Sequence, residues 1–178
     1  MKHIKNLTVR AILAATICVI APIAIPTATI PITASTLIIL IVSACIGIEY
    51  SLPAVLLYIA LGTFGLPVFA GFAGGLHILT GITGGFILGY IPCCAATGLI
   101  CSRFPDKKYV YPLSMLCGIL ICYACGVIRY SMLTDSTILS SAAVCILPFI
   151  PGDIIKILVA SAISISLKPR LRTIINNN

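Results

Sequence analysis

Charged residues are scarce in this chain. Of its 178 residues only 8% are Asp, Glu, Lys or Arg, and only 4 are acidic, whereas 60% are hydrophobic and the mean hydropathy is +1.20. Soluble domains of this length do not have such a composition. Repeated apolar stretches of nearly membrane-spanning length therefore predict an all-α integral membrane protein.

Signals for nucleotide or nucleic-acid binding are also missing. The sequence holds no GxxxxGK[ST] phosphate loop, and the connections between its hydrophobic segments are too short for a nucleotide-binding domain. The net charge of +7 is not accompanied by a basic cluster with interleaved aromatic residues, so no nucleic-acid partner is expected. Any uphill transport must therefore draw its energy from a partner protein or an ion gradient.

Metal and thiol chemistry have little support. Most of the nine cysteines fall inside hydrophobic segments, where a buried thiol behaves as a small apolar side chain. Cys122 and Cys125 form a single CxxC pair, with no second pair or histidine at ligand spacing. The sequence thus predicts no catalytic residue, no metal and no cofactor. An intramembrane enzyme using Cys122, Cys125 or His77 is the alternative from a different class.

Basic residues indicate how the chain crosses the membrane. We expect one transmembrane domain over residues 1–178, with the N-terminus inside and an uncleaved first span. Arg129 then falls outside and Lys156 within a span, while the remaining basic residues fall inside, as the positive-inside rule requires: Lys2, Lys5, Arg10, Arg103, Lys107, Lys108, Lys168, Arg170 and Arg172. Both termini are thereby predicted to be cytoplasmic and the protein to lie in the cell (inner) membrane. The six predicted spans are approximately 11–30, 33–49, 52–69, 76–102, 109–131 and 140–167.

The segment Pro148-Phe-Ile-Pro-Gly-Asp-Ile-Ile-Lys156 places charge and helix breakers in the last hydrophobic stretch. An ionisable residue at a helix centre costs about 2.5–3.5 kcal/mol on insertion scales and usually marks a functional site. Asp153 and Lys156 are three residues apart and share one helical face, so they can pair. The prolines and Gly152 leave backbone groups available to a polar ligand. This pattern predicts a binding site, with a purely structural ion pair as the alternative.

Proline and glycine shape the outer connections. The prolines of segment 25–33 favour an extended hydrophobic loop that lies against the protein as a lid. Segment 65–76 is rich in glycine and carries Phe69 and Phe72 as apolar surface. Four-residue spacing of Gly81, Gly85 and Gly89 indicates either a groove for helix packing or space for a flat ligand.

Four segments in matching order carry a family resemblance. The sequence reads PIT at 31–33, YIALGTFGLPVFAG at 58–71, TGGFILGY at 83–90 and PFIPGDIIK at 148–156. This combination resembles the BioY family, the biotin-binding substrate components (S components) of energy-coupling factor (ECF) transporters. The resemblance implies a six-helix S component that captures biotin from the outer side and docks on a transmembrane coupling subunit bearing two ABC-type ATPases. It places Ala11 and Ala15 on the docking face, and Asp153 and Lys156 on the vitamin.

Biotin chemistry suggests the remaining contacts. A carboxylate accepts hydrogen bonds only and suits the paired N–H groups of the ureido ring. The chain departs from the usual family pattern at Ser35, Ile82 and Phe86. An S component for another vitamin, such as thiamine or riboflavin, is the closest alternative, and the sequence is compatible with a monomer or a homo-oligomer. The predicted substrate-binding residues are Asp153, Lys156, Thr83, Gly84, Gly85, His77, Thr33, Phe72 and Tyr58.

Overall fold

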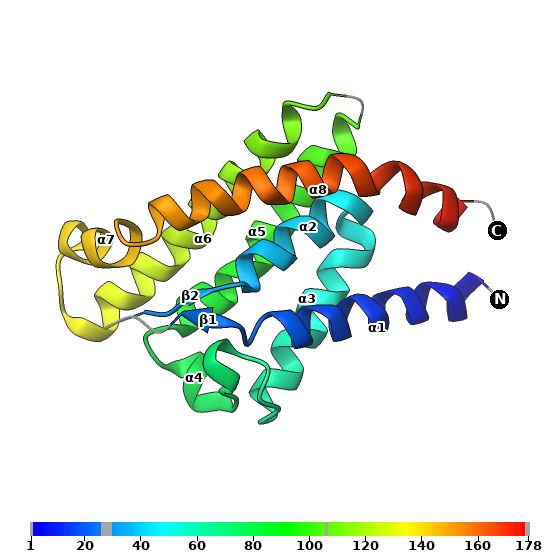
Figure 1. The fold of residues 1–178 in the computed structure, drawn as a ribbon. Coiled ribbons are helices and arrows are strands. Elements are labelled where there is room, and N and C mark those ends of the chain that lie inside the picture. Colours follow the sequence, from blue (N-terminus) through cyan, green and yellow to red (C-terminus); the bar gives the residue numbers. More distant parts are fainter. Residues whose placement is uncertain (1, 26–29, 106, 177–178) are drawn as a thin grey trace.

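The computed structural model describes residues 2–25, 30–105 and 107–176, and helices dominate this part of the chain (Figure 1). The elements in chain order are α1 (Lys2–Ile20), β1 (Ala24–Ile25), β2 (Ile32–Thr33), α2 (Ser35–Ile46), α3 (Ile48–Thr63), the 3₁₀ turn η1 (Ala70–Phe72), α4 (Leu76–Thr80), α5 (Gly84–Arg103), α6 (Val110–Thr134), α7 (Ile138–Ile146) and α8 (Ile150–Asn176).

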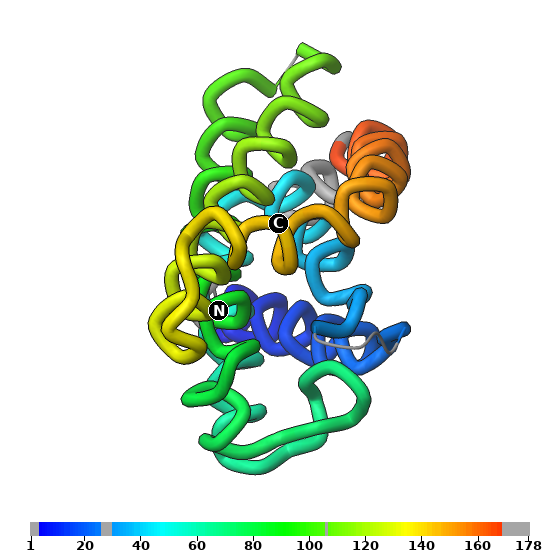
Figure 2. Tube along the Cα trace, turned by 90° about the vertical axis from the view of Figure 1, so that its left-hand side faces the viewer, coloured from blue at the N-terminus to red at the C-terminus, as the bar shows by residue number. Residues whose placement is uncertain are grey.

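The long helices form a bundle whose two ends differ. Helix α1 begins and α8 ends at the same end, while the β1–β2 hairpin, α4 and α7 gather at the other (Figure 1). Viewed from that second end, α5 and α6 lie side by side, and α8 runs along the opposite edge next to α2 (Figure 2). The short elements therefore cap one end of the bundle, which positions them above its interior.

Length and composition identify the helices that can span a membrane. Three qualify in the described part of the chain: α5, α6 and residues Ile150–Lys168 of α8. Helices α2 and α3 are apolar but shorter. Together they make a mostly helical, multi-pass membrane protein.

Several predicted spans differ from the helices that form. Helix α1 ends at Ile20 and α3 at Thr63, before the predicted ends at 30 and 69, and two further intervals each contain two helices. The interval 76–102 contains α4 and α5, separated at Gly81, whose extended backbone ends α4. The guanidinium of Arg129 donates to the carbonyl of Thr80, the last residue of α4, and so joins α6 to this break. The interval 140–167 contains α7 and α8, separated around Pro148, because proline has no N–H to continue the helical hydrogen bonds. Both interruptions lie at the capped end of the bundle.

Glycines set the distance between α5 and α6. A Cβ atom on Gly85 would lie 2.4 Å from Cβ of Arg129 and 2.7 Å from the carbonyl oxygen of Cys125. A Cβ atom on Gly89 would lie 3.1–3.2 Å from atoms of Cys122 and Cys125. Small residues allow helices in lipid to approach closely. Of the two interpretations of the glycine stripe, helix packing fits Gly85 and Gly89.

Substituting Gly85 with alanine is therefore expected to lower stability by about 1–3 kcal/mol, the usual cost of overpacking. The added methyl group meets the backbone of α6, which cannot move aside without separating the helices. Thermal unfolding of the detergent-purified protein measures the effect. Gly152→Ala is the matched control, because its Cβ meets only Ile32 at 3.9 Å. Equal melting temperatures for the two variants would contradict the packing role.

Lys168, which the positive-inside rule predicts on the cytoplasmic side, also makes packing contacts. Its side chain is 7% exposed, and its ammonium donates to the carbonyl of Cys101 at 2.9 Å, in the last turn of α5. The same ammonium lies 4.9 Å from the ring centroid of Tyr111 on α6. A cation near the C-terminus of a helix is favoured by the helix dipole. Lys168 thus connects α8 to the α5–α6 pair.

Candidate ligand-binding cavity

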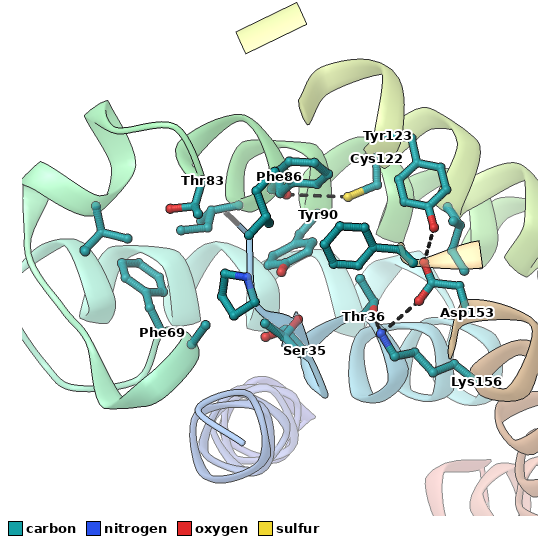
Figure 3. A pocket seen from close by; sticks show the side chains of 18 of the residues that line it. Ser35, Thr36, Phe69, Thr83, Phe86, Tyr90, Cys122, Tyr123, Asp153 and Lys156 are labelled. Carbon is teal, nitrogen blue, oxygen red and sulfur yellow. Dashed lines mark hydrogen bonds and ion pairs between the residues drawn. The ribbon is translucent and has the colours of Figure 1, made fainter. Parts of the chain in front are cut away.

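A cavity of about 200 Å³ lies at the capped end of the bundle. Its walls come from β2, α2, α3, the segment before α5, α5, α6 and α8, so segments far apart in the sequence meet there (Figure 3). Figure 3 shows Phe69 and Thr83 toward one end and the side chains around Asp153 toward the other. The cavity therefore has an aromatic end and a charged end.

The first outer connection closes part of the cavity. Ile30 is 6% exposed and lines it together with Pro31 and Thr33. Strands β1 and β2 pair in antiparallel register, Ala24 with Thr33, which holds this connection against the bundle. These residues cover the cavity as the lid prediction requires, while residues 26–29 of the predicted lid lie outside the described residues.

Aromatic side chains build the less polar end. Phe69 and Tyr58 are each 1% exposed, and their rings meet edge to face with centroids 5.6 Å apart. A Cβ atom on Gly62 would lie 2.2 Å from the Phe69 ring, so only glycine at this point of α3 lets the ring seat there. Edge-to-face contacts of this kind stabilise a fixed arrangement. The second outer connection is thereby anchored on α3, with Phe69 presented to the cavity.

The charged end is a network that joins three helices. Asp153, in the first turn of α8, accepts a hydrogen bond from the hydroxyl of Tyr123 on α6. Lys156 donates to the other Asp153 oxygen at 2.8 Å and to the hydroxyl of Thr36 on α2 at 3.1 Å. The Asp153 and Lys156 side chains are only 8% and 14% exposed. A carboxylate in the first turn is also favoured by the helix dipole.

Five of the predicted binding residues line the cavity: Thr33, Tyr58, Thr83, Asp153 and Lys156. Four do not: Phe72, His77, Gly84 and Gly85. Phe72 is 69% exposed, and His77 is exposed on the short helix α4. Gly84 packs against the backbone of Leu79, where a Cβ would lie 1.7 Å from the carbonyl oxygen. Thr83, the residue before α5, lines the cavity, whereas Gly84 and Gly85 directly after it pack against Leu79 and α6.

Several cavity residues were not predicted as contacts. Tyr123 and Thr36 complete the charged network, and the buried side chains of Ser35 and Tyr90 add hydroxyl groups to the middle of the cavity. The signal for Tyr123 was a phenol in an otherwise apolar segment, since a buried Tyr hydroxyl usually has a partner. Its partner is 30 residues away along the chain, so spacing alone does not reveal it.

The thiol of Cys122 lies in the cavity wall and is buried. Cys122 is 2% exposed, and its sulfur donates to the carbonyl of Phe86 at 3.6 Å. Cys125, its CxxC partner in the sequence, is not among the residues that line the cavity. Cysteine in such surroundings behaves as a small hydrophobe.

The charged end of the cavity is suited to an uncharged polar group of a ligand. Asp153 and Lys156 neutralise one another, so together they offer an acceptor and a donor without net charge. Phe69, Phe86 and Ile87 supply apolar surface along the rest of the cavity. Pockets of this kind, mostly apolar with a few convergent polar groups, are typical of small-molecule sites.

Comparisons with known proteins point to one group. A model of the BioY family matches residues 1–173. A protein of Thermotoga maritima named biotin transporter BioY is 34% identical over 164 residues, covering 92% of this chain and 96% of the relative. A protein of the same name from Rhodobacter capsulatus is 34% identical, covering 76% of this chain and 77% of the relative. A crystal structure of the S-component for biotin from an ECF-type ABC transporter superposes with a TM-score of 0.83 at 26% identity, covering 96% of this chain and 92% of that one.

Proposed function

The chain belongs to the BioY family, and we propose that it is a biotin-specific S component whose cavity holds the vitamin during uptake. The observation that carries the proposal is the buried Asp153–Lys156 pair at one end of a cavity that is otherwise largely apolar. A protein that only spans the membrane has no need of such a pair, because ionisable groups at membrane depth are costly.

Biotin complements the two ends of the cavity. Its ureido ring presents two N–H donors and one carbonyl acceptor, which match the Asp153 carboxylate and the Lys156 ammonium. Its thioether ring is apolar and suits the surface of Phe86 and Phe149, whose ring centroids are 6.4 Å apart. The hydroxyl of Thr83 lies toward the other end of the cavity (Figure 3), and with the hydroxyl of Thr33, which also lines the cavity, it provides a donor for the valeryl carboxylate.

Transport requires partners that supply energy. We propose that the protein lies in the cell (inner) membrane with six spans and both termini inside, and that it works with an ECF coupling subunit and two ABC-type ATPases. Ala11 and Ala15 on α1 are exposed, whereas Ala14 and Ile17 on the opposite face are buried in the bundle. The exposed pair of small residues supports docking of a partner helix there.

Isothermal titration of the detergent-purified protein with biotin tests the proposed ligand. We expect saturable binding of one biotin per chain, with no displacement by thiamine or riboflavin. Displacement by either vitamin at equal concentration would favour an S component for that vitamin. Failure to bind any of the three would overturn the proposal. The same chain expressed with and without coupling subunits, and supplied with radiolabelled biotin, then shows whether uptake depends on those partners.

A further inference from the structure

The Asp153 carboxylate is held by the protein at both of its oxygens. Tyr123 donates to Oδ2, and Lys156 donates to Oδ1 at 2.8 Å. Asp153 is 6% exposed and Tyr123 is 8% exposed, so bulk water does not replace either partner easily. Both residues line the cavity, which means that the network borders the space a ligand occupies (Figure 3).

The number of acceptor sites on the carboxylate is limited. A carboxylate offers about four lone-pair positions over its two oxygens. Two of them are used by the hydroxyl of Tyr123 and the ammonium of Lys156. The remaining positions match a ligand that brings two N–H groups from one ring. Because Lys156 already balances the negative charge, a ligand with its own positive charge gains little from Asp153 and is repelled by the ammonium.

We propose that Tyr123 is a positioning residue that makes this site select a neutral cyclic urea over a cationic cyclic guanidine. The phenol fixes the orientation of the Asp153 carboxylate from α6, while Lys156, which also donates to Thr36 of α2, fixes it from α8. Removal of the phenolic hydroxyl leaves Oδ2 buried without its donor. A buried carboxylate that lacks a donor attracts a charged N–H group more strongly than a neutral one. This inference rests on the proposed function, because it assumes that the ureido ring meets Asp153.

The test compares biotin with 2-iminobiotin, in which a guanidinium replaces the ureido group. For the Tyr123→Phe variant we expect the Kd for biotin to rise about tenfold, which corresponds to about 1.4 kcal/mol. The ratio of the Kd for 2-iminobiotin to that for biotin should fall by a similar factor at neutral pH. Tyr130→Phe is the matched control on the same helix, since Tyr130 does not line the cavity. The control should leave both Kd values within twofold of the unsubstituted protein.

A purely structural role for Tyr123 predicts a different result. A loosened cavity weakens both ligands equally and leaves their Kd ratio unchanged, and that outcome would overturn the inference. In an Asp153→Asn background Tyr123 has no carboxylate to position, so adding Tyr123→Phe should no longer alter the ratio. If Tyr123→Phe alone failed to fold, restored folding in the double variant would support the coupling, and continued misfolding would overturn it. Absence of biotin binding by the unsubstituted protein would instead overturn the proposed function.

Discussion

Replacement of Asp153 with asparagine is expected to weaken biotin binding at least 100-fold, or by about 2.7 kcal/mol. The amide keeps the size of the side chain but presents one acceptor oxygen where the carboxylate presents two. It also leaves the Lys156 ammonium, 14% exposed, without its counter-ion. A buried charge that has lost its partner is costly, and the ureido N–H groups lose a charged acceptor at the same time. Titration calorimetry of the purified variant gives the change in Kd.

A matched substitution separates this effect from a general loss of structure. Asp135 follows α6 in a left-handed conformation and is exposed outside the cavity, and asparagine tolerates that backbone geometry well. Asp135→Asn should therefore bind biotin with an unchanged Kd. Thermal unfolding of both variants shows whether each is folded. A folded Asp153→Asn protein with a Kd within threefold of the unsubstituted protein would remove Asp153 from the binding site.

The charged end of the cavity could be predicted from the sequence, because charged residues inside a hydrophobic segment are costly to bury and are visible in the local sequence. Asp153 and Lys156 are three residues apart in the last hydrophobic segment, so their pairing follows from helix geometry. The same reasoning fails for Tyr123 and Thr36, which reach the pair from other helices. Contacts across helices depend on which faces pack together, and a single sequence does not contain that information.

The same contrast between local features and contacts across helices applies to the prediction of the fold. Membrane class and the positions of the hydrophobic segments follow from composition, and the proline-rich connection near Pro31 was predicted to lie over a cavity, as it does. The break between α4 and α5 was missed, because Leu76 to Arg103 is almost uninterrupted in hydrophobicity and Gly81 alone is a weak signal. Residues on both sides of that break line the cavity, Ile78 on α4 and Thr83 before α5, whereas His77 on α4 is exposed.

Glycine was the most ambiguous residue type. Gly85 and Gly62 both provide space, but Gly85 admits the neighbouring helix α6 while Gly62 admits the ring of Phe69. In each case the absent side chain serves packing, and packing in turn positions the cavity wall. A glycine near a predicted site therefore identifies a close approach without identifying what approaches.

Bulky residues at the exposed small positions of α1 are expected to abolish biotin uptake while leaving biotin binding intact. Ala11 and Ala15 are one helical turn apart, and both face away from the bundle. A helix that docks there relies on close approach, since association in lipid is driven by packing and not by a hydrophobic force. Ala11→Trp combined with Ala15→Trp blocks that approach. If lipid alone covered this face, the larger apolar side chains would be tolerated.

Three measurements on this double variant distinguish the outcomes. Calorimetric Kd values should stay within twofold of the unsubstituted protein, because Ala11 and Ala15 do not line the cavity. Co-purification with the coupling subunit and uptake of radiolabelled biotin should both fall to background. Ala11→Ser with Ala15→Ser keeps the residues small and should preserve both activities. Leu120→Trp, on an exposed face of α6, adds the same bulk elsewhere and should have no effect. Normal uptake by the tryptophan double variant would show that α1 docks no partner through these two alanines.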